Sequence, residues 1–162
     1  MKILVPTDFS DLSKVAVLYA VRLAKKLNAD IILLAVININ ASAATSIRWE
    51  KLQEEMIKIA NEDSAKLIQE IKAEINGELP ISYHYTIGYP VQDLIESFTV
   101  ENDVDMIIMG TKGATGLKKV LMGSNATAVI DNSSKPVIAV PGETVFKPIE
   151  KIVYATDMAN LN

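Results

Sequence analysis

Short apolar segments alternate along this chain with longer segments in which apolar residues recur at helical spacing. Strands that are apolar almost throughout are typical of parallel sheets buried on both faces, and regular alternation with helices favours successive βα units. We therefore expect an α/β fold, a doubly wound parallel sheet with helices on both faces. The expected strands span residues 2–6, 30–37, 81–87, 105–109 and 135–140, and the expected helices span residues 11–27, 47–75, 91–101 and 124–133.

Residue types near the ends of the helical segments predict where two helices begin or end. Ser10 or Asp11 can cap the first helix, and Asn28 ends it. After a loose loop at residues 38–46, a long helix is expected to carry its apolar residues on one side. These residues are Leu52, Met56, Ile59, Ala60, Leu67 and Ile71.

The third expected strand alternates and therefore suits a half-covered edge of the sheet. Its histidine, His84, invites an acid–base role, but on such a strand, far from the glycine-bearing loop that follows the fourth strand, we interpret it as a surface or packing residue. Ile81, Tyr83, Tyr85 and Ile87 face one way, and Ser82, His84 and Thr86 face the other.

Composition excludes several classes of function. The chain has no cysteine and a single histidine, which excludes disulfides, thiolate metal sites and cysteine nucleophiles and argues against a Ser-His-Asp triad. Its net charge of −4 argues against nucleic acid as the main partner. No targeting leader opens the chain, and no apolar run approaches the roughly 20 residues of a membrane span. We expect a cytoplasmic protein without a membrane or nucleic-acid partner.

A glycine-bearing segment after the fourth strand carries the clearest functional signal. Gly110, Gly113, Gly123 and Ser124 give the spacing G-x2-G-x9-G-[S/T] within MGTKGATGLKKVLMGSNA. Glycines allow backbone amides to approach a phosphate, and a helix that starts at Ser124 offers unpaired N–H groups and the positive end of its dipole. The alternative is that the glycines only make turns and Ser124 only caps its helix. The spacings of a P-loop and of G-x-G-x-x-G are absent.

Asp8 is the second candidate because it follows the first strand directly, where the carboxyl ends of strands open the binding crevice of a wound sheet. If the first and fourth strands are neighbours, Asp8 and Gly110 flank the same switch point. Asp8 then accepts hydrogen bonds from a ribose hydroxyl or an adenine amine. The alternative is that Asp8 caps the following helix.

The chain contains a short internal repeat. Residues 2–12 read KILVPTDFSDL, and residues 151–161 read KIVYATDMANL. The repeat predicts a first domain at residues 1–141, a linker at 142–149 and the start of a truncated second copy at 150–162.

These segments together resemble the universal stress protein family over nearly all of residues 1–141. The resemblance is carried by KILVPTDFS, by LLAV in the second strand, by Gly88 and Pro90, and by DMIIMGTKGATGLKKVLMGSNATAVIDNSSKPVIAVP. It implies a five-stranded sheet ordered 3-2-1-4-5, similar to adenine nucleotide alpha hydrolase-like and Rossmann-like folds. Because the three-glycine loop is complete, it also implies an ATP-binding member, with ADP or AMP as other occupants.

The resemblance implies a set of binding residues. Adenine and ribose would be surrounded by Pro6, Thr7, Asp8, Val36, Met109 and Gly110, and the phosphates, with Mg²⁺ or Mn²⁺, by Gly113, Gly123, Ser124, Asn125 and Ala126. Lys112 stands where many relatives have His or Arg, so it keeps a positive charge but not a planar contact.

The resemblance further implies pairing through the fifth strand, Val137–Val140, between two chains or two tandem halves. The expected function is a nucleotide-dependent regulatory module in a stress response. Two alternatives stay open: a slow ATPase or nucleotidyl transferase that uses Lys112 and a metal, and a dimerising scaffold with an empty pocket.

Overall fold

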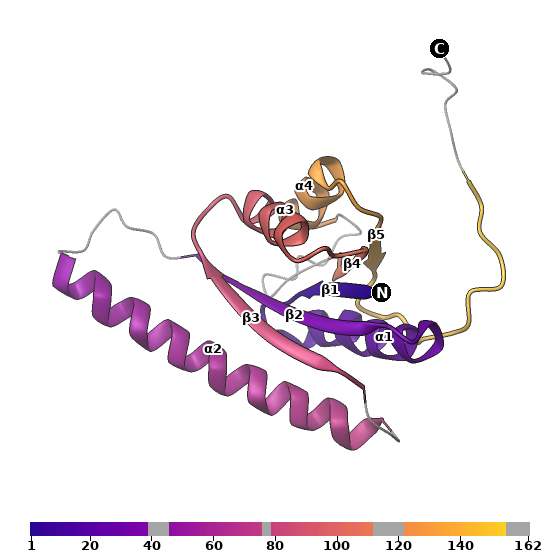
Figure 1. The fold of residues 1–162 in the computed structure, drawn as a ribbon, viewed down its shortest axis with the longest axis horizontal. Coiled ribbons are helices and arrows are strands. Elements are labelled where there is room, and N and C mark those ends of the chain that lie inside the picture. Colours follow the sequence, from indigo (N-terminus) through magenta and orange to yellow (C-terminus); the bar gives the residue numbers. More distant parts are fainter. Residues whose placement is uncertain (39–45, 76–78, 112–121, 155–162) are drawn as a thin grey trace, which may run out of the picture.

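The computed structural model describes residues 1–38, 46–75, 79–111 and 122–154, and Figure 1 shows their arrangement. At its centre lies a five-stranded sheet in the order β3-β2-β1-β4-β5, in which every neighbouring pair is parallel. The sheet confirms the predicted fold class and the strand order that the resemblance implied. The strands are β1 (Lys2–Pro6), β2 (Asp30–Ile37), β3 (Ile81–Ile87), β4 (Met106–Gly110) and β5 (Val137–Val140).

Four helices cover the two faces of this sheet (Figure 1). The chain moves outward from β1 to β3 and then returns to the other side of β1 to form β4 and β5. Since crossovers between parallel strands are right-handed, this reversal places the later helices on the opposite face. One face carries α1 (Asp11–Leu27) and α2 (Ser46–Glu74), and the other carries α3 (Val91–Glu101) and α4 (Ser124–Asn132).

Strand β1 lies in the middle of the sheet, and its side chains join the two layers of the core. Ile3 and Val5 pack with the α1 side, whereas Leu4 packs with the α3 and α4 side. All three side chains are completely buried. Because successive residues of a strand point to opposite faces, the part of a strand that is covered on both sides must be apolar at every position, as Ile3, Leu4 and Val5 are.

Helix α2 differs from the expectation in one respect. Its second half packs as predicted through Leu67 and Ile71, but in its first half Leu52, Met56 and Ile59 are 37% to 46% exposed. The 29 residues of α2 span about 44 Å, whereas the seven residues of β3 span about 23 Å. Figure 1 shows the beginning of α2 extending past the end of β3, so the sheet is too short to cover this half.

After β5 the chain passes along α1 and then leaves the domain. A Cβ atom on Gly142 would lie 2.5 Å from Leu12 of α1, and the ring of Phe146 packs edge-on against Tyr19 with a centroid distance of 5.1 Å. Residues 147–154 are exposed and form neither helix nor strand. Of the expected second copy, residues 155–162 lie outside the described part of the chain.

Candidate functional site

A cavity of about 280 Å³ opens at the carboxyl edge of the sheet, where β1, β2 and β4 end and α1, α3 and α4 begin. This edge lies next to the switch point between β1 and β4, where wound sheets bind their ligands. Lys112 and Gly113 lie outside the described residues. The other predicted binding residues all line this one cavity: Pro6, Thr7, Asp8, Val36, Met109, Gly110, Gly123, Ser124, Asn125 and Ala126.

Sequence reasoning did not find several residues of the cavity wall. Leu34 lies two residues before Val36 on the same face of β2, so the alternation of a strand could have indicated it. Likewise, Val91 and Ile95 are one helical turn apart at the start of α3. The cavity wall also includes Ser13 and Thr111. Together with Val36 and Met109, the apolar residues form a wall of the kind that accepts the flat, apolar part of a ligand.

The N-terminus of α4 is open toward this cavity. Gly123 is its N-cap residue and supplies no side-chain hydrogen bond, and the first turn contains no acidic residue. The first hydrogen bond within the helix runs from the Thr127 N–H to the Gly123 carbonyl (3.0 Å). Therefore the N–H groups of residues 124–126 lack acceptors within the helix. Ser124 is the first helical residue and does not cap the helix, which removes the alternative role considered for it.

A hydrogen bond closes the base of the segment that joins β4 to α4. The Gly123 N–H donates to the Thr111 carbonyl at 2.6 Å, and the Thr111 N–H donates to the Val140 carbonyl at 3.0 Å. These bonds tie the start of α4 to the end of the sheet. The open N–H groups are thereby held at a fixed place on the cavity wall.

The N-terminus of α1, on another wall of the same cavity, is closed by its own side chains. Ser10 is the N-cap residue, and its Oγ accepts a hydrogen bond from the Ser13 N–H (3.2 Å). Asp8 supports Ser10: its Oδ1 accepts from the Ser10 N–H (3.1 Å) and from the Ser10 hydroxyl (2.6 Å). Ser10, not Asp8, therefore caps this helix, and Asp8 lies exposed at the cavity.

Two buried hydroxyl groups lie behind Asp8. Thr7 Oγ1 and Ser13 Oγ are 3.0 Å apart, and the two residues are only 7% and 5% exposed. Thr7 Oγ1 also accepts from the Phe9 N–H (3.0 Å), and the Ser13 hydroxyl donates to the Ser10 carbonyl (2.9 Å). These bonds fix the turn between β1 and α1, in which Phe9 adopts a left-handed conformation with φ of 59°.

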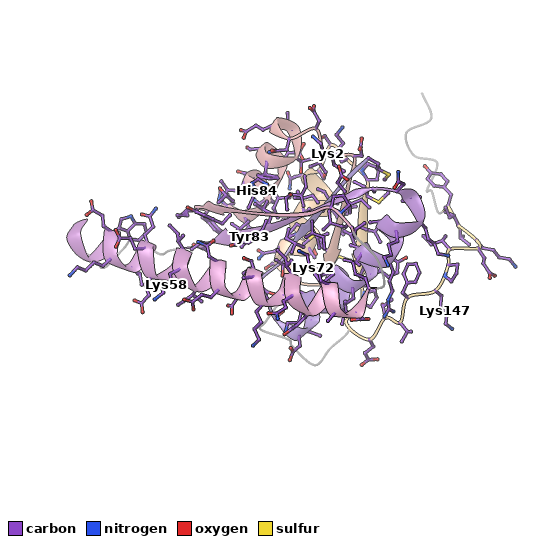
Figure 2. The ribbon with its side chains drawn as sticks, turned by 60° about the horizontal axis from the view of Figure 1, so that its bottom comes forward. Lys2, Lys58, Lys72, Tyr83, His84 and Lys147 are labelled. Carbon is purple, nitrogen blue, oxygen red and sulfur yellow. The ribbon has the colours of Figure 1, made fainter. Side chains whose placement is uncertain are left out.

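The polar side chains of β3 lie away from this cavity. Figure 2 shows Tyr83 and His84 on opposite sides of the strand, with Tyr83 toward α2. His84 is exposed, and its ring centroid lies 5.4 Å from that of Phe98 of α3, which matches the predicted packing role. The Tyr83 hydroxyl is buried and has no hydrogen-bond partner among the described residues. Burial, followed by the charges of Tyr85 and Asp63, raises the pKa of Tyr83.

Neither a metal cage nor a membrane span occurs in the described part of the chain. Residues 1–38, 46–75, 79–111 and 122–154 bring together no three His, Asp or Glu side chains that could hold a metal ion. Within the same residues, no helix combines the length and apolar character needed to cross a bilayer.

Comparisons with known proteins agree with this architecture. The chain is 32% identical over 141 residues to Universal stress protein MJ0531 of Methanocaldococcus jannaschii, covering 86% of this chain and 81% of that protein. The solved structure of MJ0577 from the same organism is 31% identical with a TM-score of 0.75, and the match covers 86% of this chain and 94% of that one. A universal stress protein from Archaeoglobus fulgidus, solved in complex with dAMP, is 23% identical with a TM-score of 0.64, covering 86% of this chain and 96% of that one.

Residues 1–141, which contain the whole sheet, its four helices and the cavity, match the Universal stress protein family. This match covers most of the chain, and MJ0531 of Methanocaldococcus jannaschii exceeds 30% identity over 86% of the chain. The chain therefore belongs to the universal stress protein family.

Proposed function

We propose that this domain binds an adenine nucleotide, foremost ATP, in the cavity at the carboxyl edge of its sheet and acts as a nucleotide-dependent regulatory module. The open N-terminus of α4 is the observation that carries the proposal. It offers several backbone N–H groups and the positive end of a helix dipole on the wall of a cavity, which together favour an anion.

The opposite parts of the cavity suit a nucleoside. Leu34, Val36 and Met109 supply apolar contact for a base. Asp8 supplies a carboxylate that accepts hydrogen bonds from sugar hydroxyls. A ligand that is apolar at one end, carries hydroxyl donors in its middle and is anionic at the other end matches a nucleoside phosphate. The dAMP in the Archaeoglobus fulgidus structure is a ligand of this class, but at 23% identity that likeness extends only to the fold.

Lys112 and Gly113 complete the proposed phosphate site. Both directly follow Thr111 in the sequence, and the Thr111 carbonyl accepts a hydrogen bond from the Gly123 N–H at the start of α4. In the proposal, Gly113 lets its backbone approach a phosphate and Lys112 adds a positive charge. Mg²⁺ or Mn²⁺ accompanies the nucleotide as the counter-ion of its phosphates, and no role of the protein side chains depends on it.

Release of the resident nucleotide tests the proposal. Freshly purified protein is heat-denatured, and the nucleotides in the supernatant are identified by ion-exchange chromatography. In a second experiment, the intact protein is titrated with ATP by calorimetry. We expect an adenine nucleotide in the supernatant or saturable ATP binding. Absence of both at millimolar ATP would leave the scaffold function. Steady-state phosphate release that Gly113→Asp abolishes in a folded protein would instead assign a slow ATPase or transferase.

We further propose that two domains pair through β5, since this strand lies at the edge of the sheet and is half-buried. An apolar edge strand left open invites pairing with another chain. Sedimentation velocity over a range of concentrations, with and without ATP, measures the pairing. A monomer at every concentration would contradict this part of the proposal.

The internal repeat supports a tandem arrangement in which residues 150–162 begin a second copy. In β1, Ile3, Leu4 and Val5 are completely buried, whereas the corresponding Ile152, Val153 and Tyr154 are 86% to 91% exposed. Apolar residues patterned like a central strand need a second sheet to cover them. The mass of the protein from its native source tests this arrangement: a mass of one domain would contradict it.

A further inference from the structure

The turn between β1 and α1 uses its hydroxyl protons internally. A carbonyl oxygen only accepts, so the Ser13 hydroxyl donates its one proton to the Ser10 carbonyl (2.9 Å). The contact between Thr7 Oγ1 and Ser13 Oγ (3.0 Å) then requires the Thr7 hydroxyl as donor. The Ser10 hydroxyl donates to Asp8 Oδ1 (2.6 Å). The three hydroxyl groups therefore have no proton left for a ligand.

The two walls of the cavity consequently differ in their hydrogen-bonding groups. Its wall from β1 and α1 presents oxygen atoms that accept hydrogen bonds, whereas its wall from α4 presents backbone N–H groups that donate them. A ligand that fills the cavity must carry donors at one end and acceptors or anionic oxygens at the other. Sugar hydroxyls and phosphates of a ribonucleotide meet this requirement.

The same hydrogen bonds connect Ser13 to the position of Asp8. The left-handed conformation of Phe9 is uncommon for a residue other than glycine, and the bond from the Phe9 N–H to Thr7 Oγ1 (3.0 Å) holds it. The Ser13 oxygen in turn holds the Thr7 hydroxyl in place by accepting the hydrogen bond that this hydroxyl donates. Asp8 lies between Thr7 and Phe9 in the chain, so the direction in which its side chain leaves the backbone depends on both, and the Ser10 N–H and hydroxyl hold its Oδ1 in addition.

We infer that Ser13 is a positioning residue for sugar recognition: through Thr7 it holds Asp8 in the direction in which its carboxylate accepts the ribose hydroxyls of the nucleotide. This inference rests on the proposed nucleotide site. It extends the site to a residue of α1 and adds a selection for ribonucleotides over nucleotides without sugar hydroxyls.

Titration calorimetry with ATP and with 2′,3′-dideoxy-ATP tests the inference. The unmodified protein is expected to bind ATP about ten-fold more tightly than the dideoxy analogue, the size expected for a hydrogen bond to a charged group. Ser13→Ala should reduce this preference to about three-fold or less by weakening ATP alone.

Ser64 provides a matched control. It is also a buried serine in a helix on the same face of the sheet, and its hydroxyl also donates to the carbonyl three residues earlier, that of Asn61 (2.8 Å). Ser64→Ala removes the same kind of hydrogen bond away from the cavity and should leave both affinities unchanged. Thermal melts of all variants report loss of folding separately.

The outcomes distinguish this inference from the proposed function. Equal weakening of ATP and the dideoxy analogue by Ser13→Ala, or an unchanged preference in that variant, would overturn the role of Ser13. Equal binding of the two ligands by the unmodified protein would overturn sugar recognition but leave nucleotide binding intact. Binding of neither ligand would overturn the proposed function itself.

Discussion

Helices α1 and α4 both begin at the carboxyl edge of the sheet and border the same cavity, but their N-termini differ. At α1, the Ser10 side chain caps the helix and Asp11 adds a negative charge in the first turn. At α4, Gly123 provides no side chain, and the first turn has no acidic residue. The first terminus has a side-chain acceptor for the Ser13 N–H, whereas the second has no side-chain cap and leaves its N–H groups to an external acceptor.

This difference shows how one fold separates stability from binding. A side-chain cap typically stabilises a helix by about 1 kcal/mol, so a helix start without a side-chain cap gives up part of that stabilisation. In α4 the missing cap faces the cavity, where a bound anion can accept hydrogen bonds from the N–H groups in place of a side chain. We interpret α1 as the structural helix start and α4 as the functional one, and the following predictions test that interpretation in order of expected effect.

The largest effect is expected from closing α4 with a side chain. Gly123 has φ of −64° and ψ of 149°, which any residue can adopt. Gly123→Asp should place a carboxylate over the open N–H groups and repel phosphate, which should weaken ATP at least about 100-fold, or about 2.7 kcal/mol. Calorimetry measures the affinity, and urea unfolding should show no loss of stability, since Asp is a favoured cap.

Gly123→Asn is the matched control for this change because it adds a cap of the same size without the charge. We expect it to weaken ATP about ten-fold, between the unmodified protein and Gly123→Asp. Equal affinity in all three proteins would contradict the functional role of the α4 terminus.

The next largest effect concerns the acceptor on the α1 side of the cavity. Asp8→Ala should weaken ATP about ten-fold, because it removes a charged acceptor, but less than the change at Gly123. Asp8→Asn retains an oxygen that can accept from Ser10 and should lose less affinity. Fluorescence competition with a labelled ATP measures both. A larger loss for Asp8→Ala than for Gly123→Asp would show that the sugar, not the phosphate, dominates binding.

Two serines at helix starts provide a test based on stability. Ser10→Ala removes the α1 cap and should lower the free energy of unfolding by about 1 kcal/mol. Ser124→Ala removes a serine that does not cap α4 and should change stability by less than about 0.5 kcal/mol. Urea unfolding of both variants decides the point: equal losses would mean that the two termini are not different.

The smallest effect is expected next to the turn that closes α1, where the ring of Phe9 packs 6.2 Å from that of Tyr83. Tyr83→Phe keeps this contact and removes a buried hydroxyl that finds no partner in the part of the chain that the structure describes, so it should be neutral or stabilise by up to about 1 kcal/mol. A stability loss above about 1 kcal/mol would indicate a hydrogen bond to the hydroxyl.

The dependence of stability on alkaline pH gives a second test of the burial of Tyr83. Burial raises its pKa in the folded protein above the value of 10.0 that it has when unfolded. The contribution of Tyr83 to the free energy of unfolding is therefore constant below about pH 10. It falls as the pH rises further, because the hydroxyl ionises first in the unfolded chain and this ionisation favours the unfolded state. The unmodified protein should lose more stability than Tyr83→Phe between about pH 10 and 11, as measured by thermal melts.

The sequence predicted the sheet well because each strand carries its own signal. Residues 3–6 are apolar throughout, as a strand buried on both faces requires, and the alternation in residues 81–87 indicated an edge strand. The exposure of Leu52 and Met56 was not predictable, because periodicity marks the apolar side of a helix but not the length of the sheet beneath it.

For the candidate site, sequence reasoning and the family resemblance named most of the lining residues but missed Ser13, Leu34, Val91, Ile95 and Thr111. Asp8 and Gly110 are found from position alone, since parallel strands end at one edge. Ser13 was missed because a serine in the first turn of a helix has many possible partners, and only the fold brings it within 3.0 Å of Thr7. The glycine spacing suggested an open helix start, but whether Ser124 capped that helix depended on the backbone.

Backbone amide shifts test the central claim most directly. In a ¹⁵N-labelled sample titrated with ATP and, separately, with adenosine, the amides of Ser124, Asn125 and Ala126 should move downfield with ATP and much less with adenosine, because only ATP brings phosphate to the α4 terminus. The capped α1 amide of Ser13 should change little in either titration. Saturable shifts elsewhere on the cavity wall, with the three α4 amides unmoved by ATP, would contradict the account.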